Sequence, residues 1–159
     1  MKQKTLSDLL KVFIVGLVAV VLIVCVWTIP SFGQSVVKAN PEFAYCYYPW
    51  LVFLLIAALP CFISLVLAWL IVDGVGKNNS FTLKNASLLK WISILAAGDA
   101  AFFFVMNVIY LFMNMNHPGI ALMSLIVVFM GVLISIVAAM LSRLVREAAG
   151  LKEESDLTI

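Results

Sequence analysis

The stretch Trp50–Val72 has the sequence WLVFLLIAALPCFISLVLAWLIV and contains no Lys, Arg, His, Asp or Glu. A transmembrane helix needs about 20 mostly apolar residues, because the hydrocarbon core of a bilayer is about 30 Å thick. A surface helix of a soluble protein has a polar face, and this stretch has none. The segment therefore predicts a transmembrane helix, which Asp73 and Gly74 end.

Three further segments are long and apolar enough to cross a bilayer. Pro30 is expected to end the first of them, since proline lacks the backbone donor that a helix interior needs. We expect an all-α fold, a four-helix transmembrane bundle formed by a single domain over residues 1–159. The three segments are Val12–Ile29, Trp91–Phe112 and Ile120–Leu141.

The composition of the whole chain excludes an ordinary soluble domain. Of its 159 residues, 65% are hydrophobic and 11% are charged, whereas soluble domains are about half apolar and about a quarter charged. Among the 10 Lys and Arg and the 8 Asp and Glu, only Asp99 lies inside an expected span. A net charge of +2 gives no reason to expect direct nucleic-acid binding.

The basic residues predict the orientation of the bundle. Nine of the 10 Lys and Arg flank the side that holds both termini and the loop 73–90, and only Lys38 lies on the other side. Loops on the cytoplasmic side carry an excess of Lys and Arg. We therefore expect cytoplasmic N- and C-termini in a bacterial plasma membrane, with a cytoplasmic tail over residues 142–159. A cleaved signal peptide is the alternative for the first segment, but 18 apolar residues exceed the usual signal core of about 7 to 15.

Asp99 is the main candidate for chemistry within the membrane. Charged groups at the bilayer centre cost about 2.5 to 3.5 kcal/mol on insertion scales, and they usually face the bundle interior. Desolvation favours the neutral acid, which can donate a hydrogen bond, and the expected partners are Ser64 and Ser135. The simpler interpretation is a polar clasp between helices, and the alternative is a proton or solute path.

No arrangement of residues in the sequence predicts an enzyme. The chain has one histidine, no paired carboxylates within the spans and no glycine-rich phosphate loop. The three cysteines lack the CxxC spacing of a metal or redox site. Met113, Met115 and His117 alternate in one loop, but a lone histidine before Pro118 is usually a turn residue. We therefore expect no cofactor and no metal.

Two segments on the expected cytoplasmic side contain recognisable patterns. Ser80 or Thr82 can cap a helix that continues into the third span. The last helix is expected to stop at Gly150, and an acidic tail follows it. The tail can be a solvated end or a docking element.

The recognisable stretches are Gly76–Phe81, the helix start with Asn85 and Leu89, and Leu151–Ile159. They resemble those of the bacterial four-pass membrane proteins catalogued as domain of unknown function 2975. Those proteins have a similar Gly-Lys-x-Phe-Ser turn and a similar ending, Glu-x-Asp-Leu-Thr-Ile or Val. This chain departs from the pattern with a wider turn and with Ser155 where Asn or Gln is common.

The family that this chain resembles has no known activity, but the genes of its members often neighbour the gene of a small helix-turn-helix regulator. It implies a plasma-membrane location and a possible regulatory partner. We hypothesise a non-enzymatic membrane regulator or adaptor, in contact with the lipid bilayer and a cytoplasmic protein. The competing hypothesis is a small proton-linked transporter or channel subunit that uses Asp99. The expected docking residues are Phe81, Asn85, Glu154, Asp156 and Leu157.

Overall fold

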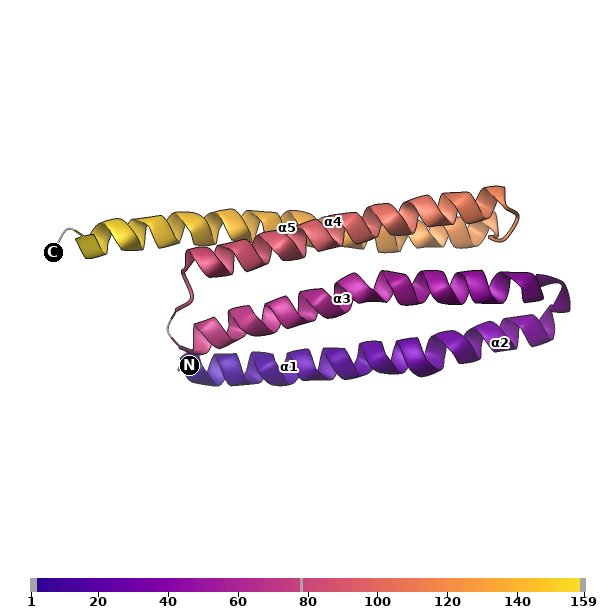
Figure 1. The fold of residues 1–159 in the computed structure, drawn as a ribbon, viewed down its shortest axis with the longest axis horizontal. Coiled ribbons are helices and arrows are strands. Elements are labelled where there is room, and N and C mark those ends of the chain that lie inside the picture. Colours follow the sequence, from indigo (N-terminus) through magenta and orange to yellow (C-terminus); the bar gives the residue numbers. More distant parts are fainter. Residues whose placement is uncertain (1–2, 78, 158–159) are drawn as a thin grey trace.

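The computed structural model describes residues 3–77 and 79–157, and every regular element in this part of the chain is a helix. The chain forms four long helical rods, which lie side by side (Figure 1). The first rod consists of α1 (Gln3–Ile23), a π-helical turn (Val24–Thr28) and α2 (Ile29–Ala39). A 3₁₀ segment (Pro41–Cys46) then leads into the remaining rods, which are α3 (Tyr47–Gly76), α4 (Leu83–Phe112) and α5 (Pro118–Leu157).

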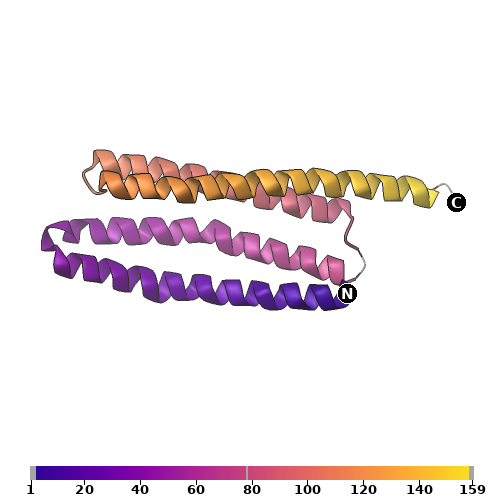
Figure 2. The same ribbon diagram turned by 180° about the vertical axis from the view of Figure 1, so that it is seen from behind.

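All four rods are long and apolar enough to cross a membrane, which confirms the expected all-α fold. Both chain ends and the α3–α4 connection lie at one end of the molecule, here called the terminal end (Figure 1). The two tight turns, between α2 and α3 and between α4 and α5, lie at the opposite end, here called the hairpin end. The same arrangement is visible from behind in Figure 2.

Pro30 does not end the first helix, contrary to the expectation from sequence. The rod continues to Ala39, and Pro30 occupies the first turn of α2. Just before it, the N–H of Ile29 bonds to the carbonyl of Val24, five residues back. A proline ring clashes with the carbonyl four residues earlier in a regular α-helix. The wider π-helical turn relieves that clash, so the chain remains helical.

The last helix also runs further than expected, because α5 passes through Gly150 to Leu157. A glycine that ends a helix usually adopts a positive φ, and no glycine in the described residues does so. Leu, Lys and Glu follow Gly150, and all three are good helix formers. The tail therefore extends the helix as far as the structure describes it.

The rods pack in the order in which they occur in the chain. Close backbone approaches join α1 and α2 to α3, α3 to α4, and α4 to α5, and none joins α5 to α1, α2 or α3. The pair α4 and α5 is the most extensively packed. Gly131 lies in this interface, where an added Cβ would stand 3.0 Å from that of Ala100. The bundle is therefore open on the side of α5 that faces away from α4.

Candidate functional site

Asp99 lies inside α4, and its Oδ1 is buried with no hydrogen-bond partner. The expected partner Ser135 is bonded to another residue. The Ser93 hydroxyl lies 2.8 Å from the Ser135 carbonyl oxygen, and the Ser135 hydroxyl lies 2.9 Å from the Ser93 carbonyl oxygen. Ser93 precedes Asp99 by six residues, or about 9 Å along the helix axis, so Ser135 is at the wrong depth.

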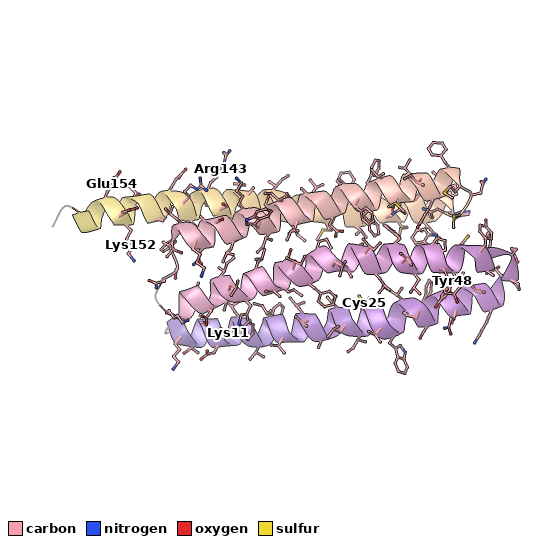
Figure 3. All side chains as sticks on the ribbon, in the orientation of Figure 1. Lys11, Cys25, Tyr48, Arg143, Lys152 and Glu154 are labelled. Carbon is pink, nitrogen blue, oxygen red and sulfur yellow. The ribbon has the colours of Figure 1, made fainter. Side chains whose placement is uncertain are left out.

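Ser64 forms no hydrogen bond with Asp99 in the described part of the chain. A thiol near the middle of the spans, that of Cys61, lies near Asp99 instead. Cys61 on α3 lies within electrostatic range of both Asp99 and Cys25. Cys25 belongs to the π-helical turn and is buried, and Figure 3 shows it between α1 and α3. No group of three or more metal-ligating His, Cys, Asp or Glu side chains occurs among the described residues.

The α3–α4 connection at the terminal end is organised by Asn85. Its side chain is 4% exposed, and its Nδ2 donates to the carbonyl oxygens of Asn79 and Ser80, each at 3.0 Å. The Thr82 hydroxyl caps α4 by accepting from the Asn85 N–H. The Asn85 amide is thus used to fold the loop, and its expected contact with a partner protein stays a prediction.

A second polar cluster ties α1 to the end of α3. Asp73 accepts from the ammonium groups of Lys11 and Lys77, at 2.7 Å in each case. The Lys11 ammonium also lies 5.4 Å from the centre of the Trp69 ring, within range of a cation–π interaction. Ser7 donates to the Val72 carbonyl in a buried hydrogen bond of 2.9 Å. This cluster fixes the depth of α1 against α3.

The other expected docking residues lie in more open positions. Phe81 is 56% exposed, and Glu154 is exposed on the last turns of α5. The backbone of Asp156 and Leu157 continues α5, while their side chains lie outside the described part. Figure 3 shows Arg143 and Glu154 on the outer side of α5, away from the other helices, with Lys152 on the opposite side.

A hydrogen-bond network at the hairpin end was not expected from the sequence. The Trp50 indole donates to the Met115 carbonyl at 2.9 Å, and the Tyr110 hydroxyl donates to the Pro49 carbonyl at 2.9 Å. The Asn116 amide donates to the Asn107 side-chain oxygen at 3.1 Å. The closely spaced aromatic and amide residues in the sequence could have indicated this network, but such residues are equally typical of anchors at the membrane surface.

Comparison with known proteins agrees with this architecture. A family model described as "Protein of unknown function (DUF2975)" matches residues 31–159. The chain is also similar to an uncharacterised membrane protein, YoaS, of Bacillus subtilis (strain 168), with 29% identity over 152 residues. That alignment covers 94% of this chain and 95% of the relative. No solved structure matches the chain. Because this family model matches most of the chain's length, the chain belongs to the DUF2975 family, and its four long apolar helices are those of a multi-pass membrane protein.

Proposed function

We propose that this protein is a non-enzymatic regulator or adaptor of the bacterial plasma membrane, and that its terminal end lies in the cytoplasm and docks a soluble protein. The observation that carries the proposal is the length of α5. Its 40 residues correspond to about 60 Å at a rise of about 1.5 Å per residue, which is twice the thickness of the hydrocarbon core. Figure 1 shows the surplus extending past the start of α4 at the terminal end.

The surface of this extension suits a protein contact. Leu144 and Leu151 are 58% and 68% exposed. They are seven residues apart, which places them two turns apart on one face of the helix. Exposed charges of both signs surround them, including Arg146, Lys152 and Glu153. An amphipathic helix of this kind binds by laying its apolar face into a groove of its partner.

The proposed partner is a small soluble protein that offers such an apolar groove. A helix-turn-helix regulator is the specific candidate, because the resemblance to the family implies one. The basic residues of the terminal end support its cytoplasmic placement, since cytoplasmic loops are enriched in Lys and Arg. In this arrangement the packing of α4 holds α5 in place, and the extension carries the contact.

The experiment compares proteins that co-purify with the full chain and with two variants, all in the native cell. One variant ends at Gly150, and the other carries Leu151→Ser. We expect both variants to lose a soluble protein that the full chain retains, because both remove apolar surface from the extension. The partner is identified by mass spectrometry, and its binding is repeated with purified components.

Leu122→Ser is the matched control, since Leu122 is also 68% exposed but lies near the start of α5 at the hairpin end. It should retain the partner at the level of the full chain. If Leu151→Ser binds as well as Leu122→Ser does, the docking surface is not this face of α5. If the chain ending at Gly150 also retains every partner, the adaptor proposal fails.

Asp99 supports a second candidate function, a proton-linked transporter or channel subunit. A buried carboxyl oxygen without a partner is costly in a membrane, and such groups often mark ion or proton paths. In reconstituted vesicles, this function predicts a proton flux that Asp99→Asn abolishes and Ser93→Ala retains. A flux that survives in Asp99→Asn contradicts the proposal.

A further inference from the structure

A cavity of about 580 Å³ lies near the hairpin end, between the first two rods and the start of α5. Its volume falls within the usual range for small-molecule sites, about 300 to 1,000 Å³. One wall comes from α2 and includes Ile29, Phe32 and Val36. The opposite wall includes Leu51 and Leu54 of α3. These side chains make the deep part of the cavity largely apolar.

The start of α5 contributes to the cavity although α5 packs against neither α2 nor α3. Pro118 and Ile120, at the start of α5, line it together with the residues of α2. No close backbone approach joins α5 to α2 or to α3. The opening between these helices therefore faces the side of the bundle, where a membrane-spanning protein meets lipid.

Polar groups gather at one end of the cavity. Asn114, Asn116 and His117 line it from the α4–α5 turn, and Asn40 lines it from the α2–α3 turn. All four residues lie at the hairpin end, while the apolar walls run from there toward the middle of the spans. This gradient matches a lipid in the adjacent leaflet, which has its headgroup at the membrane surface and its chains in the interior.

The side chain of Asn116 lacks one hydrogen bond. The Asn107 amide donates to the Phe103 carbonyl, so its oxygen faces the Asn116 amide, which donates to it. This chain of bonds fixes the orientation of Asn116, and its buried Oδ1 has no partner. A buried acceptor without a partner is unfavourable, so a shift of the Asn116 side chain that exposes this oxygen to a hydrogen-bond donor in the cavity would be favourable.

His117 supplies the complementary group. Its Nδ1 accepts from the Gly119 N–H at 3.1 Å. The neutral imidazole therefore has its proton on Nε2, which is a donor. A phosphate oxygen is a suitable acceptor for that donor. The turn thus offers one acceptor and one donor at the polar end of an apolar cavity.

We propose that this cavity binds one acyl chain of a phospholipid whose headgroup carries N–H or O–H donors. The acyl chain of the lipid occupies the space between Val36 and Leu54. The headgroup donates to Asn116, and its phosphate accepts from His117. The site is distinct from the proposed docking surface, which lies at the other end of α5.

The test measures lipid retained by the full-length protein. The purified protein is equilibrated with equal amounts of phosphatidylethanolamine and phosphatidylcholine that have the same acyl chains, and native mass spectrometry counts the bound lipid. The headgroup of phosphatidylethanolamine carries N–H donors, and that of phosphatidylcholine has none. We expect the wild type to retain a lipid after delipidation, with phosphatidylethanolamine in excess.

Val36→Trp fills the cavity and should lose the retained lipid. Val132→Trp is its matched control, because Val36 and Val132 are 38% and 41% exposed and Val132 lies outside the cavity. Ile29→Trp fills the cavity from another position on α2, so the test can still be made if either Val36→Trp or Ile29→Trp fails to fold. Thermal unfolding in detergent identifies the variants that fold. Equal retention by folded cavity-filling variants and by Val132→Trp overturns the proposal.

Asn116→Ala tests the headgroup contact separately. It should keep the lipid but lose the preference for phosphatidylethanolamine, because the acceptor is gone while the apolar walls remain. A wild type that binds both lipids equally, or an unchanged preference in Asn116→Ala, overturns the headgroup assignment.

Discussion

At the scale of single residues, polar side chains join neighbouring helices at defined depths. Ser142 on α5 donates to the Ala86 carbonyl on α4 at 2.7 Å, and Ser7 on α1 donates to the Val72 carbonyl on α3 at 2.9 Å. Both bonds are buried. Polar contacts of this kind between membrane helices contribute about 0.6 to 2 kcal/mol each. They set the registry of helices whose apolar surfaces alone would slide against each other.

Asn85 gives a prediction at this scale. Asn85→Asp keeps the size of the side chain but places oxygen where Nδ2 now donates to two carbonyls. Breaking buried hydrogen bonds and leaving an acceptor unpaired costs about 1 to 3 kcal/mol, and more when a charge is added. We expect a lower midpoint of thermal unfolding in detergent. Ser87→Asp, at an exposed position in the same turn of α4, should leave the midpoint almost unchanged.

At the scale of elements, the packing of α4 against α5 depends on small residues. Gly131 lets the two backbones approach closely, since an added Cβ would meet Ala100 at 3.0 Å and the Ala96 carbonyl oxygen at 3.7 Å. Ala100 is itself 4% exposed. Small residues at such contacts are typical of membrane helices, where close van der Waals packing replaces the hydrophobic effect.

Two glycines of this helix pair should respond in opposite ways to the same substitution. Gly131→Leu should separate α4 from α5 and lower the unfolding midpoint, because its side chain has no space. Gly98→Leu should keep or raise the midpoint, because nothing lies within 4 Å of its added Cβ. Leucine also favours a helix over glycine by roughly 0.5 to 1 kcal/mol. Equal effects in a thermal unfolding assay would show that Gly131 is not a packing position.

At the scale of the whole molecule, both chain ends and the α3–α4 connection share one end of the structure (Figure 1). Most Lys and Arg of the described residues gather there, including Lys11, Lys77 and Arg143. By the positive-inside tendency, we predict that this end lies in the cytoplasm.

Reporter fusions test this orientation. An alkaline phosphatase fused after Ile159 should be inactive in a bacterial host, because that enzyme becomes active only in an oxidising compartment. The same reporter inserted after Asn40, in the turn between α2 and α3, should be active. The reverse pattern would contradict both the orientation and a cytoplasmic docking surface.

The number of spans and the fold class could be predicted from the sequence, because apolar length alone determines whether a helix can cross a bilayer. The sequence wrongly predicted that helices end at Pro30 and Gly150. The helices continue there because of a π-helical turn and a glycine with a negative φ, and both depend on local backbone geometry. The pairing of Ser93 with Ser135 depends on the registry between α4 and α5, which sequence spacing does not reveal. The cavity requires the relative placement of three rods, which no single segment encodes.

The continuous helix of α5 has a mechanical consequence. It packs closely only on α4, and it crosses the bilayer and continues beyond it without a break. Transmembrane helices tilt when the hydrocarbon layer changes thickness. For a rod of about 60 Å, a tilt of about 10° about its midpoint displaces each tip by about 5 Å. A change in membrane thickness that tilts α5 would therefore move the tip of the extension sideways, as at the end of a lever.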